Sequence, residues 1–364
     1  MGRNYMIDYV KGFAIFFVVA IHSKTVQGTH IGMFNGDDAN FVINMFARFA
    51  VPFFFVASGY LFVQKLNRIT QENENGNRQA QFHYFKKYLG KLIKLYVAWL
   101  AFYFVFELGV KFIERGNSSE TLLEMFISSI SHFNLWSLIY FGEGSPGYHL
   151  WFLPALIYAV LLLFLFAQMR LIMVLFVISI GLHLFGLFGQ AYSFLYDVPF
   201  NTREGIFFAL FYVTFGGVVA KYSSFFNSFL SKIPTWSVVI SLIILSLMQI
   251  LEGFITLQLY EGKEENYFFF TIPLVMTLFM LALKHQQMGK NSIFTKIGAN
   301  AVGIYVSHVF IMELMQVLIR RMELTIVEDS LLWKVMLTPL VLVIALAFYN
   351  QLQNGKKAVK SIYQ

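Results

Sequence analysis

Runs of apolar residues recur along the whole chain, and shorter polar segments separate them. An apolar helix of about 20 residues crosses the ~30 Å hydrocarbon core of a bilayer, because each residue adds roughly 1.5 Å. The pattern therefore predicts an all-α polytopic membrane protein with about ten transmembrane helices. They are expected near residues 6–26, 41–64, 88–112, 149–168, 171–188, 205–221, 234–252, 267–284, 298–319 and 331–350. We expect them to form a single membrane domain over residues 1–364.

The connections between the apolar runs differ in charge. Most of the 27 Lys and Arg residues fall on one side of the membrane if the N-terminus is cytoplasmic. The positive-inside rule then predicts that the N-terminus and the C-terminus are both cytoplasmic. Residues 68–84 are predicted to be a mobile cytoplasmic loop. Residues 114–147 are predicted to be an outer-face loop, in which the semi-apolar piece 122–130 lies on the membrane interface.

The composition excludes several classes of protein. The chain is 58% hydrophobic and 13% charged, and it contains 43 Phe, which is too apolar for a soluble domain of this length. It contains no cysteine, so a disulfide framework, thiol catalysis and thiolate metal sites are excluded, and no metal site is predicted. The net charge of +7 fits the positive-inside bias better than a nucleic-acid partner. The first apolar run lacks a small-residue cleavage site, which favours a retained helix over a signal peptide.

Two ionisable residues, Lys11 and His22, lie on the first apolar run. Eleven residues make about three helical turns and ~16 Å of rise, so both side chains share one face at two depths. An ionisable group inside a bilayer is costly and marks a pathway or a reactive site. A histidine can accept a proton from a hydroxyl, although it can also simply bond a carbonyl of a neighbouring helix. Asp8 lies three residues before Lys11, which predicts an i,i+3 ion pair; snorkelling of Lys11 to the interface is the alternative.

Arg48 lies within the second predicted span, which runs antiparallel to the first. Its depth should therefore be similar to that of His22. Arginine keeps its charge in a membrane and needs an anionic or strongly polar partner. Arg48 is expected to stabilise a developing oxyanion or to bind a substrate carboxylate. Snorkelling to the outer headgroups would require a reach of ~10 Å along the helix.

Lysines gather where the third predicted span begins, and Lys87, Lys91 and Lys94 are among them. Such a cluster binds anionic lipid, and it also suits an anionic carrier such as coenzyme A. The chain has no phosphate-cradling loop of the Walker type, no dinucleotide fingerprint, no HExxH and no GxSxG. ATP-driven transport by this chain is therefore not expected.

Five further polar or aromatic residues are candidates for supporting roles. Tyr60 follows small residues that permit close helix packing. His149 and Trp151 open the fourth predicted span at the outer face, where an aromatic anchor is an adequate explanation. Tyr305 and His308 lie near the middle of the ninth span. Hydrogen bonding between helices and participation in a site are both open for this pair.

Taken together, these segments resemble the membrane acyltransferase-3 family, which transfers acyl groups, usually acetyl, onto cell-surface glycans. The first sequence pattern of the family is an acidic residue, a basic residue and, after an apolar stretch, a histidine. Lys11 occupies the basic position, where the family most often has Arg. Lysine keeps the positive charge but cannot donate the paired hydrogen bonds of a guanidinium group. The residues that carry the resemblance are Asp8, Lys11, His22, Arg48, Tyr60, Lys91, Lys94, Trp151, Pro154, Tyr305 and His308.

The resemblance implies an integral-membrane acyltransferase in the bacterial plasma membrane. Its donor substrate is cytoplasmic acyl-CoA, first of all acetyl-CoA, rather than a permanently bound cofactor. The acceptor is a hydroxyl of a surface glycan or of another envelope molecule. His22 is expected to act as general base or transient acyl carrier, with Arg48 and Lys11 beside it. Bacterial members of the family often carry an extracellular esterase-like domain; here the resemblance implies either a separate esterase-like partner protein or a membrane domain that acts alone.

A second resemblance leaves an alternative open. The segment around Arg203, with His149 and Trp151, is similar to the membrane domain of vancomycin-resistance serine racemases, which is associated with serine uptake. On this alternative the chain transports a small polar solute such as serine, and Arg48 and Arg203 bind its carboxylate. A third possibility is a non-catalytic accessory protein of glycan synthesis. A shared fold does not decide among them.

Overall fold

The computed structural model describes residues 3–72, 78–114, 121–131, 134, 137–141, 147–263 and 266–362. The prediction of an all-α fold is confirmed. Within the described ranges, strands occur only in a short hairpin of β1 (His30–Ile31) and β2 (Phe34–Asn35), which pair antiparallel. The chain divides into two compact units that are interleaved in sequence. That residues 1–364 form a single domain stays a prediction.

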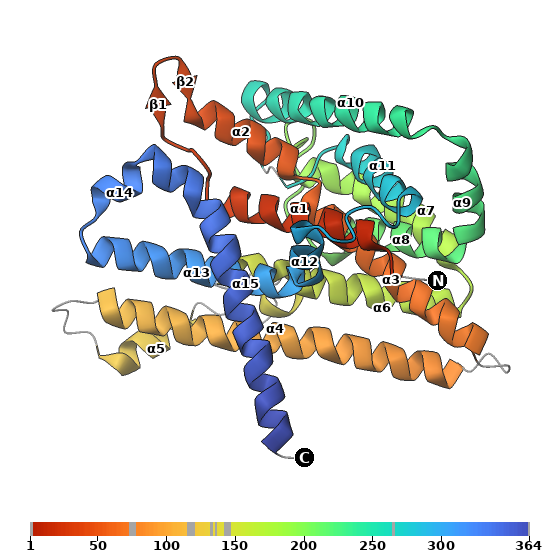
Figure 1. Cartoon of the computed structure of the whole chain (residues 1–364), viewed down its shortest axis with the longest axis horizontal. Helices are drawn as coiled ribbons and strands as arrows, with labels where there is room; N and C mark the ends of the chain where they lie inside the picture. The colour runs from red at the N-terminus through yellow and green to blue at the C-terminus, as the bar shows by residue number, and fades with distance from the viewer. Residues whose placement is uncertain are drawn as a thin grey trace. The chain divides into compact units, whose positions relative to one another are not determined.

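The first unit comprises Met1–Val51, Thr235–Ile250 and Pro273–Gln364. Within it, α12, α13 and α15 contact α1, and Figure 1 shows α2 returning beside α1 after the hairpin. Its helices are α1 (Tyr5–His22), α2 (Gly36–Ala47), most of α10 (Thr235–Gly253), most of α11 (Thr271–Lys284), α12 (Ile293–Ala299), α13 (Ala301–Arg321), α14 (Thr325–Asp329) and α15 (Leu331–Ile362).

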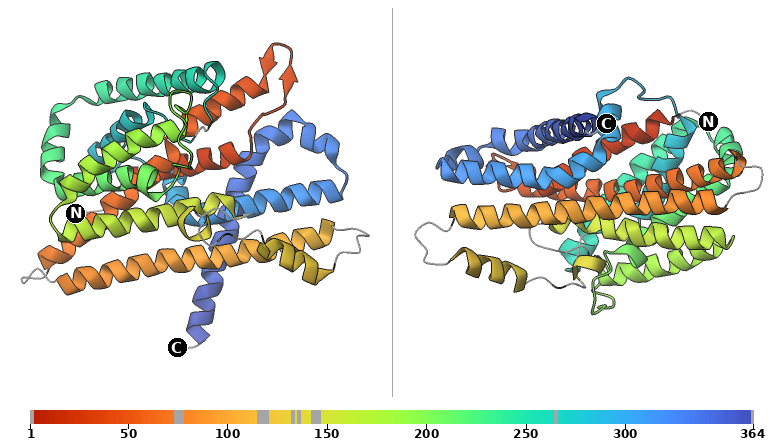
Figure 2. Two further views of the ribbon diagram at one scale, coloured as in Figure 1. Left: turned by 180° about the vertical axis from the view of Figure 1, so that it is seen from behind. Right: turned by 90° about the horizontal axis from the view of Figure 1, so that it is seen from below.

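The second unit comprises Pro52–Pro234 and Leu251–Ile272. The long helix α4 contacts α6, as the two views in Figure 2 show, and α8 packs against α6 and α7. Its elements are α3 (Ala50–Glu72, from Pro52 on), α4 (Arg78–Glu114), α5 (Leu122–Ser131), η1 (Ser137–Phe141), η2 (Tyr148–Trp151), α6 (Phe152–Gln168), α7 (Ile172–Gly186), η3 (Leu187–Gly189), η4 (Gly205–Ala209), α8 (Leu210–Lys221), α9 (Ser223–Lys232) and η5 (Phe254–Leu259).

Each predicted span is covered by one or two helices. Across the part of the chain that the structure describes, eight helices are long and apolar enough to cross a membrane. A ninth is counted if Gly205–Lys221 and Ser223–Lys232, which bend by 87°, form one span. The remaining predicted span, 267–284, corresponds to the 14-residue helix α11.

The predicted boundaries of the 68–84 connection were wrong, whereas α4 ends at Glu114 and η2 begins at Tyr148, on either side of the predicted 114–147 segment. Residues 68–72 continue α3 and residues 78–84 begin α4, so most of the predicted 68–84 loop is helical. The cause is that Gln, Glu, Lys and Arg are good helix formers, so a helix continues beyond the apolar run. Residues 73–77 lie outside the described residues. The 114–147 segment contains α5, which covers the semi-apolar piece expected there, and also η1.

Candidate functional site

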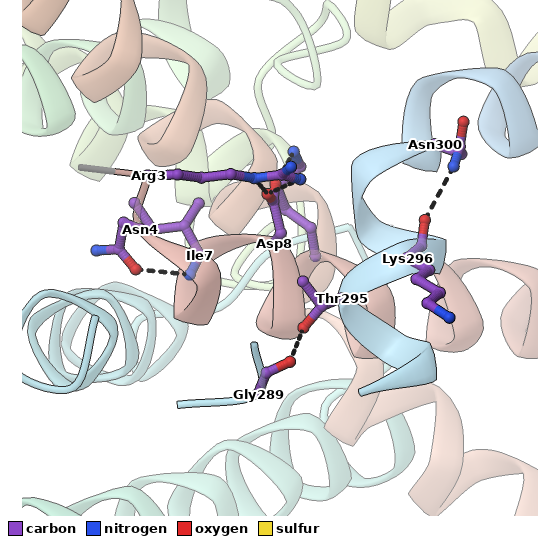
Figure 3. A network of polar contacts seen from close by, with 9 residues as sticks. Arg3, Asn4, Ile7, Asp8, Gly289, Thr295, Lys296 and Asn300 are labelled. Carbon is purple, nitrogen blue, oxygen red and sulfur yellow. Dashed lines mark hydrogen bonds and ion pairs between the residues drawn. The ribbon is translucent and has the colours of Figure 1, made fainter. Parts of the chain in front are cut away.

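The first turn of α1 holds a small cluster of charged side chains. Asn4 caps the helix by accepting a hydrogen bond from the amide of Ile7, at 3.1 Å. The Asp8 carboxylate pairs with the Lys11 ammonium at 3.0 Å, as the i,i+3 spacing predicts. Arg3 donates to the other Asp8 oxygen at 2.6 Å, and Figure 3 shows its side chain reaching across to Asp8. The ion pair lowers the cost of keeping Lys11 charged at this largely covered position.

Two glycines let α12 approach α1 closely. A Cβ added to Gly298 would lie 1.7 Å from the backbone oxygen of Asp8, and one on Gly12 would lie 2.0 Å from that of Phe294. The Phe13 and Phe294 rings stack beside this contact, with centroids 3.9 Å apart. Such direct backbone contact holds α1, and therefore Lys11 and His22, in a fixed position against α12.

His22 is the last residue of α1, and its ring lies beside a second imidazole. The ring centroids of His22 and His308 are 5.1 Å apart. His308 is fully buried on α13, and its Nδ1 lies 2.6 Å from the backbone oxygen of Tyr305. The Tyr305 ring centroid is 6.0 Å from that of His308. The structure thus brings together three residues that the sequence offered as separate candidates.

The turn after His22 is held by three hydroxyl groups. Thr338 of α15 lies with its Oγ1 2.6 Å from the Ser23 hydroxyl and 2.7 Å from the Thr25 hydroxyl. Val26 has a φ of +60°, a left-handed conformation that a β-branched residue rarely adopts. Such a conformation persists only where surrounding contacts enforce it. Thr338 was not among the residues predicted from the sequence, where its one local signal is the proline that follows it within an apolar run.

Arg48 lies where the second predicted span is interrupted. The predicted span 41–64 lies within the candidate membrane-spanning stretch Gly36–Glu72, inside which α2 ends at Ala47 and α3 begins at Ala50. Proline is tolerated in the first turn of a helix, and Pro52 occupies that part of α3. The end of α2 leaves backbone carbonyls without helical partners. The fully buried Gln249 side chain of α10 donates a hydrogen bond to the backbone carbonyl of Met45, at 2.7 Å.

Aromatic contacts place Arg48 relative to α1. The Phe17 ring lies 5.1 Å from the Phe46 ring and 5.9 Å from the Phe49 ring, and these two residues flank Arg48 in sequence. Phe17 precedes His22 by five residues, which is about 7.5 Å of helix. Arg48 thus lies next in sequence to residues whose rings contact α1, and its Nη2 donates to the Asn44 side chain. The negative end of the α2 dipole favours its charge.

A polar network in the second unit surrounds Arg203. Its guanidinium carbon lies 5.1 Å from the Trp151 ring, and its Nη1 donates to Asn266 at 3.3 Å. Asn266 in turn donates to the buried Gln190 at 2.7 Å. His149 is also buried, with its ring 5.0 Å from that of Tyr103. Arg203 and Trp151, two of the predicted site residues, are thus in contact, and Arg203, Asn266 and Gln190 hydrogen-bond one another in a chain.

The remaining candidates have simpler surroundings. Tyr60 is buried on α3 and accepts a hydrogen bond from Gln64 at 3.3 Å. Lys87, Lys91 and Lys94 are exposed on α4, where they are free to meet either lipid headgroups or an anionic donor. No group of three or more His, Asp or Glu among the described residues is arranged to hold a metal ion.

Two buried glutamates of the second unit, Glu204 and Glu252, were also not predicted from the sequence. Glu252 accepts hydrogen bonds from the Tyr192 hydroxyl and from the amides of Phe269 and Phe270, at 2.6, 2.6 and 2.8 Å. These amides immediately precede α11, so Glu252 anchors the start of that helix. Glu204 accepts a hydrogen bond from the Tyr140 hydroxyl at 3.1 Å. Burial raises the pKa of the Glu204 carboxyl.

Comparisons with known proteins cover much of the chain. Residues 4–350 match a family model described as an acyltransferase domain. An amino-acid racemase of Enterococcus faecalis is 29% identical over 224 residues, or 58% of this chain and 28% of the racemase. A serine/alanine racemase of Enterococcus gallinarum is 27% identical over 234 residues, or 61% of this chain and 30% of the racemase. The chain thus spans less than a third of these curated relatives. No solved structure matches it.

Proposed function

Since the chain belongs to the acyltransferase-3 family, whose model it matches over residues 4–350, we propose that it transfers an acyl group across the membrane. The donor is acyl-CoA on the cytoplasmic side, with acetyl as the acyl group. The acceptor is a hydroxyl of a surface glycan or of another envelope molecule outside the bacterial plasma membrane. The paired imidazoles of His22 and His308 at the end of α1 support this proposal most directly.

His22 acts as the general base in the proposed reaction. The acceptor hydroxyl attacks the thioester carbonyl, so that a C–O bond forms and the C–S bond breaks. The hydroxyl proton passes to the His22 imidazole and from there to the departing thiolate of coenzyme A. In the covalent variant, His22 itself first takes the acyl group and then passes it to the hydroxyl. The C-terminus of α1 favours the positive charge that either route places on His22.

Cationic side chains have further roles in the proposed reaction. Arg48 stabilises the oxyanion of the tetrahedral intermediate, a contribution of about 3 kcal/mol for a well-placed donor. Lys11, paired with Asp8, lines the route by which the pantetheine arm reaches His22. Lys87, Lys91 and Lys94 bind the phosphates of coenzyme A. Their exposure on α4 supports that role.

The test measures release of coenzyme A from acetyl-CoA by the protein reconstituted in liposomes with cell-envelope polysaccharide. A thiol reagent can report this release without background from the chain, which contains no cysteine. His22→Ala is expected to lower the rate by about 100-fold or more, because general base catalysis supplies roughly that factor. His83→Ala, at an exposed position on α4, is the control and should leave the rate unchanged. Full activity of His22→Ala would remove His22 from the mechanism.

One observation favours a second candidate, a transporter for a small amino acid. Arg203 lies over Trp151, and the two curated relatives are racemases, one of them of serine and alanine. Thermal unfolding with increasing serine or acetyl-CoA separates the candidates. Saturable stabilisation by acetyl-CoA supports the transferase, and saturable stabilisation by serine alone supports the transporter. A non-catalytic accessory protein would respond to neither.

A further inference from the structure

We propose that α9 lies flat in the headgroup region of an anionic membrane surface, with Phe225 and Phe229 among the lipid chains. Lys221 and Lys232, at the two ends of the helix, bind the phosphates of anionic lipids. This surface lies outside the proposed transfer site and does not depend on acyl transfer. The proposal is carried by the bend between α8 and α9 and by the exposure pattern of α9, both within the second unit.

The helix α9 begins where a candidate membrane-spanning segment ends. That segment, Gly205–Lys221, is ~25 Å long, and α9 turns away from it by 87° (Figure 1). Tyr222 lies at the turn with a φ of −106° and a ψ of 36°, which is not a helical conformation. The ten residues of α9 make ~15 Å of helix, which is too short to cross a bilayer alone. A helix at a right angle to a crossing segment adds almost no depth, so α9 runs along the membrane surface.

The side chains of α9 fall on three faces of the helix. Phe225 and Phe229, which are one turn apart, are 66% and 49% exposed. Leu230 is only 3% exposed, so its face is covered by protein. Asn227 and Ser231, also one turn apart, are exposed on the side opposite the two phenylalanines. An exposed apolar face opposite an exposed polar face is typical of a helix that lies in the membrane interface.

Positive charge marks both ends of α9. Lys221 immediately precedes the turn, Lys232 is the last residue of the helix, and both are exposed. The Lys221 ammonium lies 5.6 Å from the centroid of the Tyr222 ring. The sequence has no Asp or Glu between residues 205 and 251, so this stretch of chain carries only positive charge. Each lysine near a membrane surface favours anionic lipid by about fivefold, which makes anionic headgroups the complementary partner.

Single cysteines test how α9 is oriented, because the chain contains no cysteine of its own. All four chosen positions are exposed, so the covered side of α9 is left unchanged; the variants are Phe225→Cys, Asn227→Cys, Phe229→Cys and Ser231→Cys. Each variant carries a nitroxide label and is reconstituted in liposomes that contain phosphatidylglycerol. Electron paramagnetic resonance then measures the depth of the label from its collisions with oxygen and with a water-soluble nickel complex.

The expected result is a depth that alternates along the helix. Labels at positions 225 and 229 should lie about 5–10 Å below the lipid phosphates, and labels at 227 and 231 should remain in contact with water. A label at Val177→Cys, an exposed position within the candidate span of α7, is the control and should be deep. A depth that increases steadily from 225 to 231 would mean that α9 continues into the bilayer. Water contact at all four positions would mean that it projects from the membrane, and either result would overturn the proposal.

The lipid preference is measured with a bimane fluorophore attached at Phe229→Cys. Phosphatidylglycerol and phosphatidylcholine, brominated on their chains, are supplied in turn, and the ratio of quenching gives the relative occupancy of the two lipids beside α9. Phosphatidylglycerol should be enriched about fivefold or more, and adding Lys221→Gln and Lys232→Gln should bring the ratio to about one. The fluorophore at Val177→Cys should be quenched equally by both lipids. Equal quenching at Phe229→Cys with both lysines present would overturn the proposal, whatever the result for acyl transfer.

Discussion

Replacing Gly298 by alanine tests whether the direct contact of α12 with α1 supports the site. The added Cβ would lie 1.7 Å from the backbone oxygen of Asp8, whereas ordinary contacts begin above 3 Å. A backbone oxygen cannot rotate away as a side chain can, so the two helices must separate by more than 1 Å. Overpacking of this kind costs about 1–3 kcal/mol. Alanine recovers about 0.5–1 kcal/mol in a helix relative to glycine, which leaves a net loss of up to about 2.5 kcal/mol.

The assay is thermal unfolding of the purified protein, together with coenzyme A release. Gly298→Ala should lower the thermal midpoint and also the rate, because α1 carries both Lys11 and His22. Gly90→Ala in α4 is the matched control, since nothing lies within 4 Å of its added Cβ, and it should leave the midpoint equal or higher. Unchanged stability and activity in Gly298→Ala would refute the close packing of these two helices.

Three further predictions concern residues that the sequence alone did not single out. Glu252→Ala should lower the free energy of unfolding by about 2–4 kcal/mol, because two backbone amides and the Tyr192 hydroxyl lose their acceptor. Chemical denaturation measures this loss, and a value below about 0.5 kcal/mol would contradict the prediction. Thr338→Val should lower kcat while Thr338→Ser retains it, because only serine keeps the hydroxyl that meets Ser23 and Thr25; equal rates in both variants would contradict it. Burial raises the folded-state pKa of the Glu204 carboxyl above its ordinary value of 4.5. The contribution of this carboxyl to stability is therefore complete below pH 4.5 and is lost as the pH rises through the folded-state pKa. Glu204→Gln should flatten this fall in thermal midpoints measured from about pH 4 to pH 8, and an unchanged slope would contradict the assignment.

The apolar pattern predicted the helices well because membrane insertion imposes it locally. Each of the ten predicted spans has a helix, and the Asp8–Lys11 pair follows from spacing on one helix. Helix ends were predicted less well, because hydropathy marks where a helix leaves the apolar region, not where it ends. The 68–84 segment shows this, since α3 and α4 both extend into it.

Contacts between distant parts of the chain could not be read from one sequence. Thr338 meets Ser23 across 315 positions, and Gln249 meets Met45 across 204. Apart from the proline that follows Thr338, the only local signal of Thr338 and of Gln249 is that each is a polar residue in an apolar run. The interruption at Arg48 was also hidden, because the residues around it are apolar on both sides and only Pro52 hinted at a new helix start. His22 and His308 were both candidates, but their proximity came from the packing of α1 and α13.

The most direct test of the account supplies donor and acceptor on opposite sides of a membrane. Proteoliposomes enclose envelope polysaccharide, and acetyl-CoA labelled in the acetyl group is added outside. The account predicts that label enters the enclosed polysaccharide with the unaltered protein, and that His22→Ala abolishes this transfer without changing the amount of folded protein. Label that appears only when both substrates share one side, or that appears equally with His22→Ala, would contradict it.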